Sequence, residues 1–232
     1  MEENEVIQQL KEKVATSCQI LGKLGLADYL GHVSARVPGT DKVVIKPRHS
    51  PSIRSFKEMT AKEMIVVNLD GELLEGDYAP ASETQLHLQV LKARPDVGSV
   101  VHTHQKLATA FGIAQREILP ILHLEAGVVA KGVPIYPSSE LIVTVEQGAA
   151  VARALGQATA CHLQGHGVVV VGETVEEATV NTVQLERLAD INLIVAQLGT
   201  AKVIPPEDIA KNTAQKQPIG GRWAHYCSLL EE

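Results

Sequence analysis

The sequence predicts a single α/β domain with a largely antiparallel or mixed sheet. Helical and strand-like segments both occur, without the regular strand–helix alternation that builds a parallel sheet. The chain has 232 residues, of which 45% are hydrophobic. This length supports one large core, whereas a second full domain would have little room. Neither an internal repeat nor a low-complexity linker divides the chain, so we expect one domain over residues 1–232.

The first half of the chain is expected to begin with a helix and continue with short strands. Apolar residues recur at helical spacing between Val6 and Leu24, with Glu and Lys between them, which is typical of an amphipathic helix. Alternating and β-branched residues then predict strands, and Asp70-Gly71 is a strong hairpin signal. In chain order these strands are expected at residues 32–37, at 43–45 and, as a hairpin, within 64–74. Residues 46–58 show no periodicity and are expected to form a polar loop.

The second half is expected to alternate strands and helices more closely. A helix is expected from Glu83 to Arg94, because a proline follows and the residue before a proline disfavours helical geometry. Thr174 and Glu177 have capping-box spacing, which predicts the start of a long helix. The other expected elements are strands at 97–104, within 128–136, at 160–164 and at 168–171, and helices at 106–115, 146–155 and 174–198. The tail from Pro205 to Glu232 is expected to be irregular.

Composition argues against several classes of protein. The net charge is -6 and no long run of one sign occurs, which argues against a nucleic-acid partner. No apolar run reaches the roughly 18 residues that a membrane helix needs, and the acidic N-terminus differs from a secretory signal. The three cysteines lack metal-ligand spacing and fit buried thiols in a reducing compartment. We therefore expect a cytoplasmic protein with no membrane partner.

Two histidines in the expected strand 97–104 suggest a metal site. Side chains alternate across a strand, so the rings of His102 and His104 should point to one face, where both would reach a single divalent ion. His166 lies between two glycines, which let the backbone turn sharply near a ligand. Three imidazoles leave coordination positions open, as catalytic metal sites do. The simpler alternative is that His102 and His104 are solvent-facing strand residues.

Glu83 and His87 stand on one face of the helix that precedes this strand. A carboxylate near a helix N-terminus is suited to proton transfer beside a metal. The simpler alternative for Glu83 is that it is a helix-capping charge next to Ser82. For His87 we expect a buried position on the core side.

Together these motifs resemble the class II aldolase/adducin family. The resemblance spans roughly residues 6–200 and rests on Gly31-His32-Val33-Ser34-x-Arg36, Ala81-Ser82-Glu83-x-x-x-His87, His102-x-His104 and His166-Gly167 with Gly172 beyond it. It implies a single α/β/α domain with a central, mainly antiparallel sheet. It also implies one divalent metal per subunit (zinc, manganese or iron) on His102, His104 and His166, with Glu83 as acid/base. The family forms cyclic tetramers with sites between subunits, so a homo-oligomer is expected, a tetramer or a multiple of it.

The chain departs from the family's sugar-phosphate aldolases where those enzymes bind phosphate. His32 replaces an asparagine, Ala81 replaces a serine, and residues 48–54 replace a small phosphate loop. A tyrosine proton donor of the fuculose-phosphate aldolases aligns with Leu124. Its neighbour His123 is therefore a second catalytic candidate, near the metal.

The replacements favour a branch of the family that decarboxylates hydroxylated aromatic dicarboxylates, of the 3,4-dihydroxyphthalate or 3-hydroxy-2-methylpyridine-4,5-dicarboxylate type. Arginines bind planar carboxylates bidentately, although Arg48 and Arg54 would also suit a solvated loop. Tyr226 is included because tails in this family reach a neighbour's site. The expected substrate-binding residues are His32, Ser34, Arg48, His49, Ser50, Arg54, Ser82 and Tyr226.

Two other functions remain open. A sugar-phosphate aldolase or 4-epimerase would use the same metal and Glu83, but it needs a phosphate cradle that residues 46–54 do not obviously offer. A non-enzymatic, adducin-like scaffold would have little reason to keep all three histidines together with Glu83.

Overall fold

An eight-stranded sheet forms the centre of the computed structural model, which describes residues 2–214 and 219–231. The strands are β1 His32–Arg36, β2 Lys42–Ile45, β3 Ile65–Asn68, β4 Leu73–Glu75, β5 Ser99–Thr103, β6 Ile135–Tyr136, β7 Ala160–Leu163 and β8 Gly167–Gly172. Their order across the sheet is β4-β3-β2-β1-β5-β8-β7-β6. All neighbouring strands pair antiparallel except β6 and β7, which are parallel. The prediction of a mainly antiparallel sheet is confirmed.

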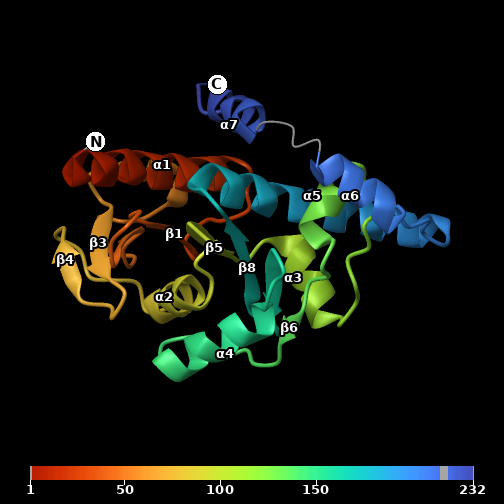
Figure 1. The fold of residues 1–232 in the computed structure, drawn as a ribbon, viewed down its shortest axis with the longest axis horizontal. Coiled ribbons are helices and arrows are strands. Elements are labelled where there is room, and N and C mark those ends of the chain that lie inside the picture. The colour runs from red at the N-terminus through yellow and green to blue at the C-terminus, as the bar shows by residue number, and fades with distance from the viewer. Residues whose placement is uncertain (1, 215–218, 232) are drawn as a thin grey trace.

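Helices cover both faces of this sheet (Figure 1). They are α1 Glu3–Lys23, α2 Thr84–Ala93, α3 Lys106–Ile113, α4 Val145–Leu155, α5 Val175–Leu198, α6 Pro206–Ala214 and α7 Ile219–Ser228, with 3-10 turns at Phe56–Glu58 and Glu125–Val129. On one face lie α1, α3 and α5, and on the other lie α2 and α4. The architecture is therefore the expected α/β/α sandwich.

Strand β8 shows how the sheet supports cores on both faces. Val168 and Val170 pack into the cluster with α3 and α5, while Val169 and Val171 pack into the cluster with α2 and α4. Successive side chains point to opposite faces of a strand. A continuous valine run therefore suits a strand that is covered on both sides.

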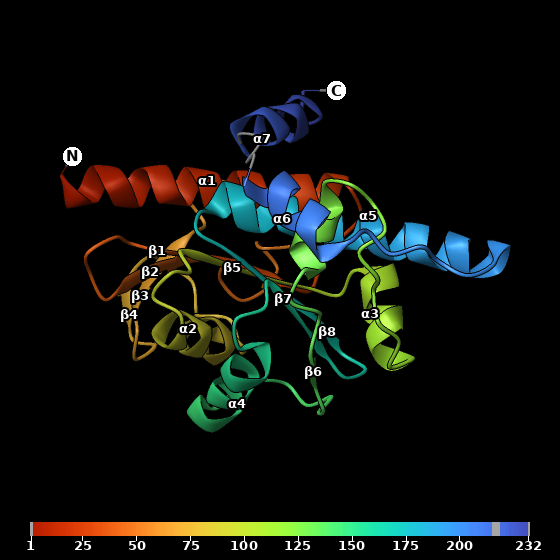
Figure 2. The same cartoon turned by 45° about the vertical axis from the view of Figure 1, so that its right-hand side comes forward.

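Most predicted boundaries agree with the structure to within a few residues. The hairpin is formed by β3 and β4 around Gly71, whose φ is +95°. At the start of α5 the Thr174 hydroxyl accepts a hydrogen bond from the Glu177 N–H, but the Glu177 carboxylate accepts one from the Glu173 N–H rather than from Thr174. The predicted capping box is therefore only half formed. Figure 2 shows α5 running past the end of the sheet.

The prediction of an irregular tail is wrong. Residues 206–214 form α6, and residues 219–228 form α7; positions 215–218 and 232 lie outside the described residues. Helix α6 has Pro206 in its first turn, where a backbone N–H would have no partner within the helix, so the missing N–H of proline costs nothing. Helix α7 contains Gly220 and Gly221, which are poor helix formers, and Trp223 packs against the α1 core cluster. Tertiary packing stabilises this helix, which the local pattern does not reveal.

No helix in the described part of the chain is both long enough and apolar enough to span a membrane.

Candidate active site

The three predicted metal ligands meet at one end of two neighbouring strands. His102 lies in β5, His104 directly follows β5, and His166 lies in the turn between β7 and β8. Because β8 pairs with β5, with Val168 opposite Thr103, this turn lies beside the end of β5. A Cβ atom on Gly167 would lie 2.5 Å from the Thr103 carbonyl oxygen. Only glycine permits so close an approach.

The geometry of the triad suits one divalent ion. One ligand nitrogen from each histidine lies within 4.8 Å of the others. The Nε2 atoms of His102 and His104 are 3.2 Å apart, and two nitrogens on one tetrahedral ion are separated by about 3.3 Å. The His102 Nδ1–H donates to the Val168 carbonyl at 2.9 Å, which leaves Nε2 as the ligand atom. Both ring nitrogens of His166 are buried without a hydrogen-bond partner in the described residues. The three residues are therefore able to hold an ion.

Electrostatics favour neutral rings at this site. Burial, together with the nearby His102 and His166 rings, lowers the pKa of His104 to about 4. Burial also lowers the pKa of His166. A neutral imidazole offers a nitrogen lone pair, which a metal ligand requires.

Glu83 faces the triad rather than the helix that follows it. Its Oε2 lies 3.5 Å from His102 Nε2, and its Oε1 lies 3.6 Å from His166 Nε2. Oε1 also accepts a hydrogen bond from the Ile142 N–H at 3.1 Å, whereas the side chain makes no capping hydrogen bond to α2. Burial disfavours the charged form, but the close contacts with His102 and His166 and the hydrogen bond from the Ile142 N–H outweigh it and lower the pKa of Glu83 to about 2. The carboxylate is therefore ionised at neutral pH, and the capping alternative is not what the geometry shows.

His32, Ser34 and His87 lie behind the triad. The centroid of the His32 ring is 6.0 Å from that of His102 and 5.8 Å from that of His87. Ser34 is fully buried, and its hydroxyl is 2.8 Å from His87 Nδ1. His87 is fully buried as expected, and burial lowers its pKa to about 3. His32 thus reaches the site, but Ser34 lies behind His87 and is not placed to contact a substrate.

The two loop arginines have different surroundings. Arg48 is exposed, and its Nη2 donates to Ser82 Oγ at 2.8 Å, beside Glu83. The Arg54 side chain is 72% exposed and lies 3.6 Å from the Glu58 carboxylate. Arg48 is thus brought to the candidate site, whereas Arg54 matches the alternative of a solvated loop charge.

His49 and Ser50 mainly organise the loop that carries Arg48. His49 Nδ1 lies 3.0 Å from the Ile53 carbonyl oxygen. Ser50 Oγ accepts a hydrogen bond from the Ile53 N–H and lies 3.1 Å from Ser52 Oγ. The Tyr29 ring stacks on His49 at 3.9 Å.

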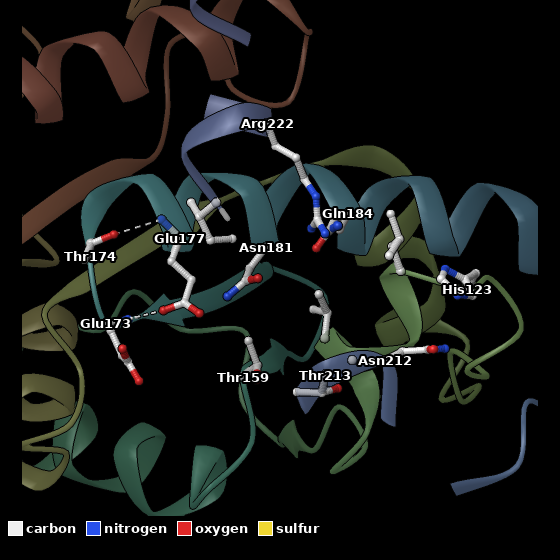
Figure 3. Close-up of a pocket in the computed structure, with 14 residues that line it drawn as sticks. His123, Thr159, Glu173, Thr174, Glu177, Asn181, Gln184, Asn212, Thr213 and Arg222 are labelled. Carbon is white, nitrogen blue, oxygen red and sulfur yellow. Dashed lines mark hydrogen bonds between the residues drawn. The ribbon is translucent and has the colours of Figure 1, made fainter. Parts of the chain in front are cut away.

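His123 does not join the triad within one chain. It lines a separate cavity of about 370 Å³ together with Asn181, Gln184 and Arg222. Figure 3 shows His123 at one end of this cavity and Arg222 reaching from α7 towards Gln184. Tyr226 lies on the same helix α7, where burial raises its pKa. The structure thus does not bring His123 and Tyr226 to the histidine triad of their own chain.

The sequence reasoning missed one residue near the site, Lys46. It follows β2 directly and has no solvent exposure. Strand alternation could have predicted its burial. Lys46 stands two residues after Val44 and so points to the same face of the strand, towards the α1 core cluster.

Comparisons with known proteins identify relatives of this chain. The family model "Class II Aldolase and Adducin N-terminal domain" matches residues 12–193. A 3,4-dihydroxyphthalate decarboxylase from Arthrobacter keyseri is 33% identical over 216 residues, covering 87% of this chain and 85% of that protein. A second one, from Terrabacter sp. (strain DBF63), is 32% identical over 211 residues, covering 86% of this chain and 87% of that protein.

Solved structures share the fold. An L-fuculose 1-phosphate aldolase from Glaciozyma antarctica PI12 superposes with a TM-score of 0.83 at 22% identity, covering 100% of this chain and 92% of that one. At this identity the likeness concerns the fold alone.

Proposed function

Because this chain belongs to the class II aldolase and adducin family, we propose that it is a metal-dependent decarboxylase of a hydroxylated aromatic dicarboxylate, of the 3,4-dihydroxyphthalate or 3-hydroxy-2-methylpyridine-4,5-dicarboxylate type. The relatives that are 32–33% identical over most of the chain are 3,4-dihydroxyphthalate decarboxylases. One structural observation carries the proposal. The Arg48 guanidinium donates a hydrogen bond to Ser82, the residue directly before Glu83.

The triad accounts for the metal dependence. A divalent ion held by His102, His104 and His166, such as zinc, manganese or iron, supplies Lewis-acid stabilisation of negative charge on a substrate oxygen. Imidazole ligands suit all three metals.

Arg48 accounts for the recognition of a carboxylate. Its planar guanidinium presents paired N–H donors, which match the two oxygens of a carboxylate. Because it bonds to Ser82, the residue before Glu83, it would hold the ring by one carboxylate with the reacting carbon near Glu83.

Glu83 moves the proton. Its ionised carboxylate accepts the proton of a ring hydroxyl and returns it to the ring carbon that bears the departing carboxylate. The bond from that carbon to the carboxylate then breaks, carbon dioxide leaves, and the bonding electrons restore the aromatic ring. The product oxygen regains a proton from solvent.

We further propose a cytoplasmic homo-oligomer, a tetramer or a multiple of it, with sites near subunit interfaces. His123 and Tyr226 lie away from the triad of their own chain and would serve a neighbouring subunit.

The proposal is tested by measuring carbon dioxide release from both candidate substrates with enzyme reconstituted with zinc, manganese or iron. We expect release from one of them, and we expect a chelator to abolish it. Arg48→Gln should raise KM at least about tenfold through loss of a charged hydrogen-bond donor, while the matched variant Arg54→Gln should leave KM unchanged. If enzyme of verified metal content released no carbon dioxide from either substrate but cleaved a ketose 1-phosphate, the aldolase alternative would be established instead. Failure to bind metal at all would favour the scaffold.

A further inference from the structure

Lys46 is a buried cation that the proposed reaction does not use. We propose that it is a positioning residue, which holds the loop of residues 47–53 in the shape that presents Arg48 to the candidate site. Its effect on substrate binding rests on the proposed function, whereas its effect on the loop does not.

The surroundings of Lys46 offer hydrogen bonds but no counter-ion. Its Nζ donates to the Pro47 carbonyl at 3.2 Å, lies 3.3 Å from His49 Nε2, and sits 5.0 Å from the centre of the Phe56 ring. Among the described residues no carboxylate lies within ion-pair distance of it. Burial of an ammonium without a counter-ion costs stability. A gain in order of the loop would explain why this cost is tolerated.

His49 links Lys46 to the far end of the loop through its two ring nitrogens. Its Nδ1 faces the Ile53 carbonyl, an acceptor, so Nδ1 carries the proton and donates. Nε2 is then the acceptor for the Lys46 ammonium. The loop is thus tied from Lys46 at its start to Ile53 at its end, and the stacked Tyr29 ring covers His49.

Arg48 lies between the two groups that Lys46 contacts. Its backbone N–H donates to the Ala79 carbonyl at 2.9 Å, and its guanidinium donates to Ser82 at 2.8 Å. If Pro47 and His49 lost their bonds to Lys46, the backbone on both sides of Arg48 would be freer. The guanidinium would then spend less time bonded to Ser82.

The charge state of Lys46 is consistent with this role. Burial lowers its pKa to about 8, which still leaves the amine mainly protonated near pH 7. The Cys18 thiol faces it from α1, and burial raises the pKa of that thiol to about 12, so the thiol is neutral. Hydrogen bonds from a charged donor are stronger than those between neutral groups.

A Lys46→Met variant separates positioning from simple structural support. It removes both hydrogen bonds but fills the same space with an apolar chain, so thermal stability should stay equal or rise. Hydrogen exchange of the non-proline amides in residues 48–54 should become about tenfold faster, because two hydrogen bonds are lost. KM for the dicarboxylate should rise about tenfold while kcat stays within about twofold. Lys11→Met is the matched control, since Lys11 is another buried lysine but pairs with Glu75 on β4.

The outcomes are distinguishable. Unchanged hydrogen exchange of the loop amides in a folded Lys46→Met protein would overturn the inference, regardless of which substrate the enzyme uses. Faster exchange with unchanged KM would overturn the link to Arg48. Faster exchange in a protein that decarboxylates neither substrate would leave the loop role intact and refute the proposed function. If Lys46→Met does not fold, His49→Phe keeps a ring stacked on Tyr29 but removes the bonds to both Lys46 and Ile53, and unchanged exchange and KM in that variant would equally refute the inference.

Discussion

At the residue scale, Glu83 is the side chain on which the proposed chemistry depends. It is buried, contacts two of the three histidines, and is held by the Ile142 N–H. Its lowered pKa keeps the carboxylate ionised at neutral pH. Its role follows from this placement and not from helix capping.

Glu83→Gln keeps the shape and the bond to Ile142 but removes the group that accepts the proton. We expect kcat to fall about 10²–10⁴-fold, with the metal content unchanged by elemental analysis. Glu58→Gln, at an exposed position beside Arg54, is the control and should keep full turnover. Turnover near the wild-type value in Glu83→Gln would show that another group moves the proton.

At the element scale, the turn between β7 and β8 brings His166 to the end of β5. Gly167 has no side chain, and a Cβ there would lie 2.5 Å from the Thr103 carbonyl oxygen and 2.8 Å from His104 Cδ2. The two elements therefore approach closely enough to share a metal only because this position is glycine.

Gly167→Ala should weaken metal binding at least about tenfold and lower the free energy of unfolding by about 1–3 kcal/mol, because the added methyl group overpacks the contact. Metal titration and thermal unfolding measure both effects. Gly221→Ala in α7 is the control, since a Cβ atom there would have no neighbour within 4 Å among the described residues and helix propensity favours alanine. Normal metal affinity in Gly167→Ala would mean that the two strands separate without disturbing the triad.

At the scale of the whole molecule, the far end of α5 presents an apolar surface. Leu193, Ile194 and Leu198 are exposed there, the last at 82%, and Ile113 on α3 is exposed as well. Figure 2 shows this end of α5 projecting beyond the sheet. Contiguous exposed apolar side chains are typical of protein interfaces.

We therefore expect a homo-oligomer in solution, with a mass that is a multiple of 24.9 kDa by light scattering. Leu198→Glu should reduce the assembly, because a charge would be buried at the interface. Leu74→Glu, on the exposed strand β4, should not. A monomeric wild-type protein would contradict both the assembly and the proposed roles of His123 and Tyr226 in a neighbouring site.

The sequence by itself determined an α/β domain with a largely antiparallel or mixed sheet, and the family motifs in it implied the layered arrangement and the grouping of the triad with Glu83. Alternation and helical spacing are local properties, so the strands, the Asp70-Gly71 hairpin and α1 to α5 were predictable. The motif His102-x-His104 places both rings on one side of a strand for the same reason, and the structure confirms that they meet His166. That these residues bind a metal stays a prediction.

Only the tertiary structure decided which loop residues reach the site. Arg48 and Arg54 look alike in the sequence, but one meets Ser82, 34 positions away, and the other meets Glu58. Side chains of an irregular loop have no period from which their direction follows. The burial of Lys46, the distance of His123 from the triad, and the helices of the tail likewise depend on packing between distant segments, which local propensity does not encode.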